Sequence, residues 1–181
     1  MQLLKDQDAS LKPLQGKTVA VLGYGNQGQA QALNLRDSGV NVIVGNRDDK
    51  YRQRAIADGF APMSIAAAAE AGDILLVLTT DESQPVIWPE QIAPGVKPGK
   101  TLVWASGYNV GYGLIEPPAD VDVIMVAPRM TGPHVRALFV QGSGALAQFA
   151  VHQDASGNAR AMVQALREDR LDQRARAADR R

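Results

Sequence analysis

A glycine-rich segment after the first apolar run limits what this chain can fold into. Residues 18–22 are Thr-Val-Ala-Val-Leu, and Gly23, Gly25 and Gly28 follow in the pattern Gly-x-Gly-x-x-Gly. Between a strand and a helix, the first glycine permits a sharp turn, the second lets backbone approach a pyrophosphate, and the third lets helix pack on strand. The N–H groups and the dipole of the helix start favour phosphates. The segment predicts dinucleotide binding; a tight turn without a ligand is the alternative.

Short apolar runs alternate with helical patterns along the rest of the chain. Strands are expected at residues 18–22, 40–44, 74–78, 101–105, 121–126 and 146–151, with a short one near Phe60. Helices are expected at residues 27–38, 65–71, 86–91 and 155–181, and a charged loop and helix are expected from residue 46 to the Asp-Gly pair at 58–59. Such alternation is typical of an α/β fold, with a doubly wound parallel sheet of the Rossmann type. We predict a lead-in over 1–16, an NAD(P)-binding Rossmann domain over 17–153, and a C-terminal helix with a charged tail over 154–181, fraying from 174.

Composition excludes several classes of function. The 181 residues suffice for one domain with a sizeable core, and the 19 basic and 19 acidic side chains cancel. This balance argues against nucleic acid or a membrane surface as a partner. The chain has no cysteine, which excludes disulfides and thiolate nucleophiles. No apolar run approaches the roughly 20 residues that span a bilayer, and no signal-peptide core is present. We therefore expect a cytoplasmic protein.

The residues after the second expected strand bear on the choice of dinucleotide. Residues 44–47 read Val-Gly-Asn-Arg, so the strand end lacks the carboxylate that commonly binds the ribose 2′-hydroxyl of NAD. Arg47, Lys50 and Arg52 can surround a 2′-phosphate. Asp48 and Asp49 oppose it, because carboxylates repel phosphate. The arrangement favours NADP over NAD, while a solvated helix start of mixed charge is the alternative without a ligand.

Four longer blocks point to a family. They are Lys17-Thr-Val-Ala-Val-Leu-Gly-Tyr-Gly-Asn-Gln-Gly, Ala32-Leu-Asn-Leu-Arg-Asp-Ser-Gly-Val-Asn-Val, Val121-Asp-Val-Ile-Met-Val-Ala-Pro and Ala150-Val-His-Gln-Asp-Ala-Ser-Gly. Through them, residues 3–164 resemble the N-terminal domain of ketol-acid reductoisomerase. That family serves branched-chain amino acid biosynthesis by a magnesium-assisted alkyl migration followed by reduction with NADPH. The resemblance implies an NAD(P)H-dependent oxidoreductase, and we expect a small 2-keto acid or an imine as substrate.

The resemblance also implies which residues bind the cofactor. Residues 24–27 match the family's pyrophosphate turn, and Arg47 matches its 2′-phosphate arginine. Residues 81–84 match a segment beside the cofactor, although Asp81 and Ser83 can also be helix caps. Gly132 belongs to a turn where backbone can approach a ligand. The predicted cofactor residues are Gly23, Tyr24, Gly25, Asn26, Gln27, Gly28, Arg47, Lys50, Arg52, Asp81, Glu82, Ser83, Gln84 and Gly132.

The chain departs from the family at the catalytic positions. Ser106 stands where the family has a histidine, and a serine has no pKa near neutrality with which to carry a proton. Arg129 replaces a lysine. We predict that Ser106, Arg129 and His134 polarise or protonate the substrate; His134 as a solvated or structural residue is the alternative. His152 is interpreted as part of a structural turn.

In the family, a knotted all-helical second domain supplies the carboxylates for two magnesium ions, and we expect no counterpart of that domain within these 181 residues. The late acids Glu168, Asp169, Asp172 and Asp179 are more typical of surface ion pairs, so we expect no magnesium site in this chain alone. Two alternatives stay open: an inactive dinucleotide-binding protein or partner-completed subunit, and a truncated reductoisomerase. A homodimer or partner contact is expected through the apolar stripe of the C-terminal helix, which is Ala161, Val163, Leu166 and Leu171.

Overall fold

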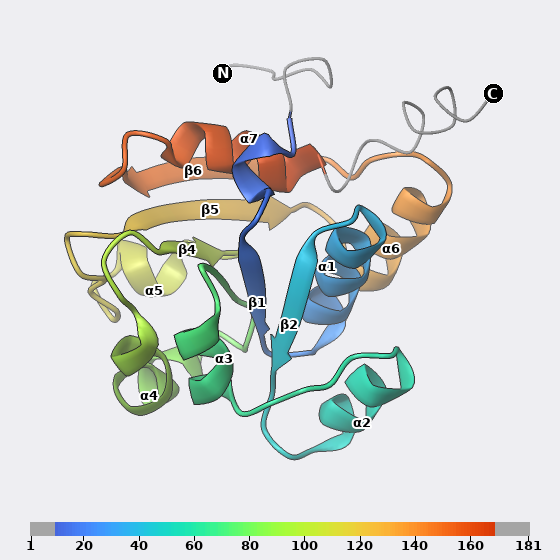
Figure 1. Cartoon of the computed structure of the whole chain (residues 1–181), viewed down its shortest axis with the longest axis horizontal. Helices are drawn as coiled ribbons and strands as arrows, with labels where there is room; N and C mark the ends of the chain where they lie inside the picture. Colours follow the sequence, from blue (N-terminus) through green and yellow to red (C-terminus); the bar gives the residue numbers. More distant parts are fainter. Residues whose placement is uncertain (1–9, 169–181) are drawn as a thin grey trace.

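The predicted strands assemble into one sheet in the computed structural model, which describes residues 10–168. The order is β2-β1-β3-β4-β5-β6, and β1 to β5 pair in parallel. The order reverses beside β1, which has β2 on one side and β3 on the other, and such a switch point is where α/β sheets bind ligands. This confirms the doubly wound fold (Figure 1). The strands are β1 (Thr18–Leu22), β2 (Asn41–Gly45), β3 (Ile74–Val77), β4 (Thr101–Trp104), β5 (Asp122–Pro128) and β6 (Ala147–Gln153).

Helices connect the strands and cover both sides of the sheet. Three of them, at residues 12–14, 108–111 and 132–140, are absent from the helices expected above. The expected helix at 86–91 is a series of short turns over residues 84–95. The helices are η2 (Lys12–Leu14), α1 (Asn26–Asp37), α2 (Lys50–Ala57), α3 (Ile65–Ala71), α4 (Gln84–Ile87), η3 (Trp88–Ile92), η4 (Ala93–Gly95), α5 (Tyr108–Gly111), α6 (Gly132–Val140) and α7 (Ala159–Glu168).

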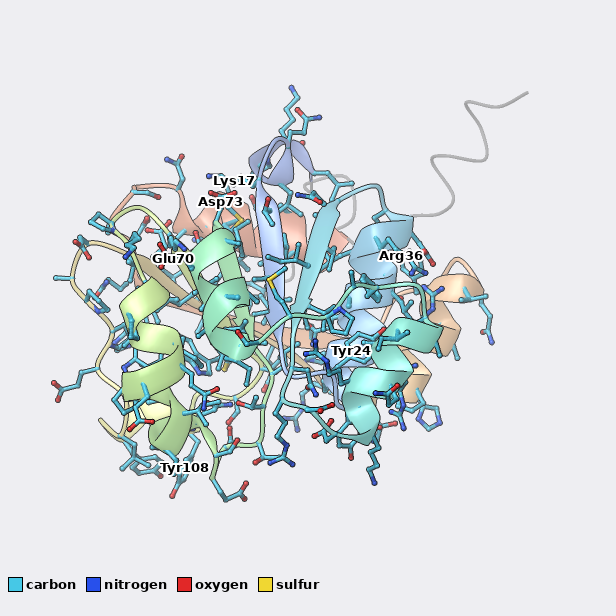
Figure 2. All side chains as sticks on the ribbon, turned by 60° about the horizontal axis from the view of Figure 1, so that its bottom comes forward. Lys17, Tyr24, Arg36, Glu70, Asp73 and Tyr108 are labelled. Carbon is cyan, nitrogen blue, oxygen red and sulfur yellow. The ribbon has the colours of Figure 1, made fainter. Side chains whose placement is uncertain are left out.

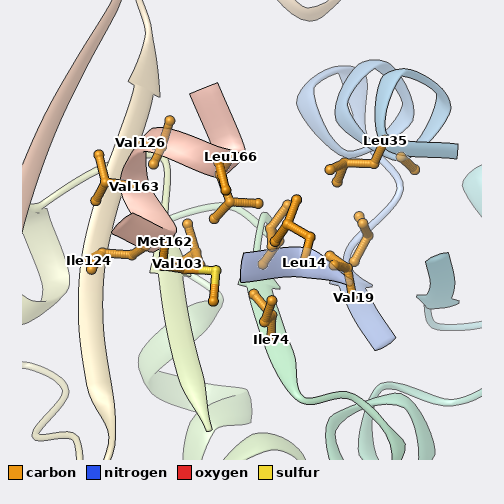
Figure 3. Packing of buried hydrophobic residues seen from close by; sticks show 14 of the residues in the cluster. Leu14, Val19, Leu35, Ile74, Val103, Ile124, Val126, Met162, Val163 and Leu166 are labelled. Carbon is orange, nitrogen blue, oxygen red and sulfur yellow. The ribbon is translucent and has the colours of Figure 1, made fainter. Parts of the chain in front are cut away.

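The central strands are apolar at consecutive positions because both of their faces are covered. Val19 and Val21 face a cluster that includes residues of η2, α1 and α7, shown from close by in Figure 3. Ala20 and Leu22 face a second cluster, which includes residues of α3 and η3. All four side chains are fully buried. The position of β1 between two cores fixes the glycine-rich turn that follows it.

Two strand predictions are wrong. β6 runs antiparallel to β5, whereas the alternation of strands and helices predicts a parallel sheet. Its first residue, Ala147, pairs with Pro128 at the end of β5, and the Arg129 N–H donates to the Leu146 carbonyl over 2.9 Å. Residues 129–146, which include α6, thus begin and end at the same edge of the sheet, where β5 ends and β6 begins. The strand expected near Phe60 is a single bridge between residues 45 and 63.

The C-terminal helix belongs to the core of this chain. α7 starts at Ala159, later than expected, where the Asp154 carboxylate accepts a hydrogen bond from the Ala159 N–H over 3.0 Å. Val163 and Leu166 of the predicted stripe are buried in the same cluster as Leu14 of η2. These two residues are therefore covered within the chain and Ala161 is half-buried, while Leu171 and the tail expected to fray lie outside the described residues.

The two edges of the sheet differ in chemistry. Lys17 and Asp73 lie at the edge where β1 and β3 begin, opposite the edge that carries Tyr24 and Tyr108 (Figure 2). At the first edge, Asp73 accepts a 2.7 Å hydrogen bond from the Thr18 N–H, which ties β3 to β1. The predicted site residues follow the strands at the second edge.

No helix in the described part of the chain has the length and hydropathy of a membrane span.

Candidate dinucleotide-binding site

The three glycines of the turn have different surroundings. Gly23 has a φ of +98°, which side chains disfavour, and a Cβ there would lie 2.8 Å from the Thr79 nitrogen. A Cβ on Gly28 would overlap the Gly23 carbonyl oxygen. A Cβ on Gly25 would meet no heavy atom within 4 Å. Gly23 and Gly28 are thus explained by the fold itself, whereas the space beside Gly25 suits a pyrophosphate.

The start of α1 faces this space without a side-chain cap. Gly25 is the N-cap residue, and it makes no capping hydrogen bond through a side chain. The first N–H groups of a helix have no partner within the helix, and they bind anions well. The N–H of Tyr24 is already used, because it donates to Asn46 Oδ1 over 2.9 Å. The available donors are therefore those of residues 25–27, which fits the phosphates of a dinucleotide.

A second helix start packs against the first. A Cβ on Gly132, at the start of α6, would overlap the carbonyl oxygen of Asn26. Gln27 Nε2 donates to the carbonyl of Met130 over 2.9 Å, so the loop before α6 is fixed to the first turn of α1. Gly132 thus permits close packing of α6 on the backbone of the glycine-rich turn. The side-chain amide of Gln27 is hydrogen-bonded to the protein backbone.

The side chain of Tyr24 points into the protein. It is fully buried, its ring lies edge-on to Phe60 at 5.7 Å, and its hydroxyl donates to Asp58 Oδ2 over 3.0 Å. Burial, together with the Asp58 hydrogen bond and charge, raises the pKa of the Tyr24 hydroxyl far above its usual range. Tyr24 therefore contributes to the turn by anchoring it between α1 and α2.

We expect Tyr24→Phe to lower the free energy of unfolding by about 1 kcal/mol at neutral pH, because one hydrogen bond is lost and the ring packing is kept. The folded-state pKa is raised, so this stabilisation is complete below the unfolded value of about 10 and is lost as pH rises through the folded value. Wild-type stability should thus fall more steeply above about pH 10 than that of the variant. Denaturant unfolding across this pH range measures both effects. The control is Tyr112→Phe at a ring that is 76% exposed, and equal alkaline slopes for wild type and Tyr24→Phe would contradict the expectation.

The loop after β2 is organised by one carboxylate. Asp49 caps α2 by accepting from the N–H groups of Tyr51 and Arg52, over 2.9 and 3.3 Å. It also accepts from Asn46 Nδ2 over 2.9 Å and from Arg47 Nε over 2.8 Å. Partial burial raises the pKa of this carboxyl, but the hydrogen bonds outweigh burial and leave the pKa below its ordinary value. The charge of Asp49 is thus engaged within the loop, and the side chain of Arg47 beside it is 80% exposed.

The other two cations of the predicted phosphate site differ from Arg47. Arg52 Nη1 donates to the carbonyls of Asn46 and Met63, each over 3.2 Å, so its guanidinium braces the loop. Lys50 is exposed, and its ammonium lies 5.2 Å from the centre of the Tyr51 ring. Of the three, Arg47 has the most direct access to a ligand at the end of β2.

The segment after β3 forms a buried polar network. Gln84 is 2% exposed; its Oε1 accepts from Trp104 Nε1 and Asn109 Nδ2 over 3.0 and 2.8 Å, and its Nε2 donates to the Thr79 carbonyl over 2.9 Å. No side chain caps α4, so the capping alternative for residues 81 and 83 is wrong. Ser83 donates instead to the carbonyl of residue 80 over 2.8 Å, and Glu82 is exposed. The amide of Gln84 therefore holds the ends of β3 and β4 together.

The predicted catalytic residues stand at the same sheet edge but have separate partners. Ser106 Oγ donates to Asp81 Oδ2 over 3.0 Å. Arg129 Nη1 donates to Gln148 over 3.4 Å. His134 Nδ1 lies 2.7 Å from the hydroxyl of the N-cap residue of α6, Thr131. Across residues 10–168, no hydrogen bond joins Ser106, Arg129 and His134 to one another.

Sequence reasoning missed two residues. The interpretation of His152 as part of a turn is wrong: it lies in β6, and it lines a pocket together with Ser106, Val110 and Met125. The pairing of β6 with β5 brings it there, and the sequence carries no signal of that pairing. Asn46 is buried and joins the turn after β1 to the loop after β2. A polar residue directly after an apolar strand is a signal that could have identified it.

Comparison with known proteins confirms the resemblance drawn from the four sequence blocks. Residues 13–170 match the family described as acetohydroxy acid isomeroreductase, NADPH-binding domain. The ketol-acid reductoisomerase (NADP(+)) of Pyrobaculum arsenaticum is 51% identical over 159 residues, which cover 87% of this chain and 48% of the relative. That of Methanopyrus kandleri is 52% identical over 155 residues, covering 85% and 48%. The structure of an NADH-preferring ketol-acid reductoisomerase from an uncultured archean superposes with a TM-score of 0.90 at 40% identity, covering 94% of this chain and 54% of that one. The chain spans about half the length of the curated relatives it matches.

Proposed function

The chain belongs to the acetohydroxy acid isomeroreductase family, and from this membership we propose that it binds NADPH for the reduction of a small 2-keto acid or an imine. The observation that carries the proposal is the open space beside Gly25, in front of an α1 start that no side chain caps. It lies at the switch point of the sheet, where ligands bind in folds of this kind. Relatives include proteins named for NADP and one named for a preference for NADH, so NAD is the second candidate.

Each part of the site has a proposed task. The N–H groups of residues 25–27 hold the pyrophosphate, and Arg47 holds the 2′-phosphate with Lys50 beside it. Bound NADPH supplies the hydride. Ser106, whose hydroxyl donates to Asp81 in the structure, polarises the substrate carbonyl or imine together with Arg129 and His134. Ser106 must turn its hydroxyl from Asp81 to the substrate for this role.

The proposal concerns the reductase step alone. Within residues 10–168, no three side chains of His, Asp or Glu lie together as a metal site requires. The alkyl migration of the family depends on magnesium, and the residues described here offer no ligand set for it.

The activity is tested by NADPH oxidation with 3-hydroxy-3-methyl-2-ketobutyrate, with simple 2-keto acids and with cyclic imines. We expect turnover with at least one of these compounds, and Ser106→Ala should slow it. Tight NADPH binding without oxidation of the cofactor by any of them would instead support a dinucleotide-binding protein without catalysis.

Cofactor preference is tested at Arg47. We expect Arg47→Ala to weaken NADPH binding by about 1–3 kcal/mol and to leave NADH binding nearly unchanged, because a charge-assisted contact to the 2′-phosphate is lost. Calorimetric titration with each cofactor measures the difference. Arg54→Ala removes the same charge from the far part of α2 and serves as the control. An equal loss for NADPH and NADH would refute the phosphate role of Arg47.

A further inference from the structure

Asn46 lies between the two loops to which the proposed function assigns the phosphates of the cofactor. It directly follows β2 and is only 5% exposed. Its Oδ1 accepts a 2.9 Å hydrogen bond from the N–H of Tyr24, the residue between the first two glycines of the turn. One end of this side chain is therefore fixed to the pyrophosphate turn.

The other end of the same side chain is fixed to the 2′-phosphate loop. Asn46 Nδ2 donates to the carbonyl of Arg47 over 2.8 Å and to Asp49 Oδ1 over 2.9 Å. The other oxygen of Asp49 accepts from Arg47 Nε over 2.8 Å. A continuous series of hydrogen bonds thus runs from the Tyr24 backbone through Asn46 and Asp49 to the guanidinium of Arg47.

The backbone of Asn46 keeps this side chain in place. Its N–H donates to the Met63 carbonyl over 3.0 Å, and its carbonyl accepts from Arg52 Nη1 over 3.2 Å. Both polar atoms of the side-chain amide also have protein partners, and the residue is buried, so we assign Asn46 no direct contact with the cofactor. A group held in this way can act on binding only through the residues that it orients.

We propose that Asn46 is a positioning residue for NADP preference, which sets where the Arg47 guanidinium stands relative to the amides of the glycine-rich turn. This inference rests on the proposed cofactor binding. A ligand with both a pyrophosphate and a 2′-phosphate must meet both groups at once, and it binds more tightly when the protein has already fixed their separation. A ligand without the 2′-phosphate uses only the turn.

A side-chain amide can both accept a hydrogen bond from the glycine-rich turn and donate one to the loop after β2. Its oxygen accepts from the Tyr24 N–H while its nitrogen donates to Asp49. Aspartate at position 46 could still accept from Tyr24, but it would repel Asp49 and lose both donated bonds. Alanine would lose all of these contacts without a change in charge, so its effect on binding cannot arise from charge at position 46.

The test compares ADP-ribose 2′-phosphate with ADP-ribose by calorimetric titration of the full chain. We expect Asn46→Ala to weaken both ligands and to reduce the ratio of their affinities by about tenfold, because Arg47 loses its fixed position. In an Arg47→Ala background, Asn46→Ala should leave this ratio unchanged. Asn41→Ala, at the exposed start of the same strand, is the control and should keep the wild-type ratio.

The possible failures are distinct. If wild-type protein binds neither ligand, the proposed function is wrong and the inference is wrong with it. If wild type prefers the 2′-phosphate ligand and Asn46→Ala keeps that ratio, or lowers it equally with and without Arg47, only the role of Asn46 is refuted. Should Asn46→Ala not fold, Asn46→Asp provides the same comparison: we expect it to lower the ratio and spare ADP-ribose binding, and an unchanged ratio would overturn the proposal.

Discussion

Replacing Gly25 with valine is expected to abolish dinucleotide binding and to leave the fold intact. The residue has a φ of −70° in the extended region, and a Cβ there meets no heavy atom within 4 Å. The protein therefore has room for the new side chain. Its methyl groups would occupy the space that we assign to the pyrophosphate, in front of the α1 amides. We expect at least a roughly 100-fold loss of affinity for NADPH and NADH alike, which is about 2.7 kcal/mol or more.

Cofactor titration and thermal unfolding of the same sample separate the loss of binding from a loss of stability. The thermal midpoint of Gly25→Val should lie within a few degrees of wild type, because only an N-cap preference is disturbed. Gly111→Val places the same side chain at another glycine with open space and serves as the control, with binding of ADP-ribose 2′-phosphate retained. Wild-type affinity in Gly25→Val would mean that the pyrophosphate does not lie beside this residue.

Gly28→Ala is expected to cause the largest loss of stability in the turn. A Cβ at this position would overlap the carbonyl oxygen of Gly23, which is backbone and cannot rotate away. Gly23 is itself fixed, because its N–H donates to the Gly45 carbonyl over 2.8 Å at the end of the sheet. Either α1 moves away from β1 or the turn distorts. We expect a loss of about 3 kcal/mol or more, well beyond the helix propensity that alanine gains over glycine, about 1 kcal/mol.

Denaturant unfolding measures this loss, with Gly25→Ala as the matched control in the same turn. The control adds the same methyl group where nothing opposes it, so its cost should stay within about 1 kcal/mol. Equal stability of the two variants would show that the contact between the start of α1 and the end of β1 is looser than described.

The features predicted from sequence are those that local pattern determines. The apolar runs of β1, β3 and β4, the sharp turn at Gly23 and the close packing at Gly28 are each read within a few residues, and the structure confirms them. The pyrophosphate contact expected beside Gly25 stays a prediction. The direction of β6 depends on where α6 packs, and α6 is held against Asn26, more than 100 residues earlier in the chain. No short window of sequence contains that information.

In the candidate site, too, local sequence indicates single residues but not the contacts between distant ones. The sequence predicts a phosphate role for Arg47 because a cation after the second strand has a known meaning, but it indicates Asp49 only as a charge that repels phosphate. In the structure Asp49 is a helix cap that also holds Arg47. The link from Tyr24 to Asn46 spans 22 residues, and that from Asp81 to Ser106 spans 25. Such pairs become visible only when the parallel strands align their ends.

The most direct test of dinucleotide binding follows the backbone amides of the turn by NMR while ADP-ribose 2′-phosphate is added. The account predicts that the N–H signals of Gly25, Asn26 and Gln27 shift most, and that they saturate together with the calorimetric binding curve. Saturable binding that leaves these three signals in place would contradict it, as would the absence of binding at ligand concentrations of about 1 mM.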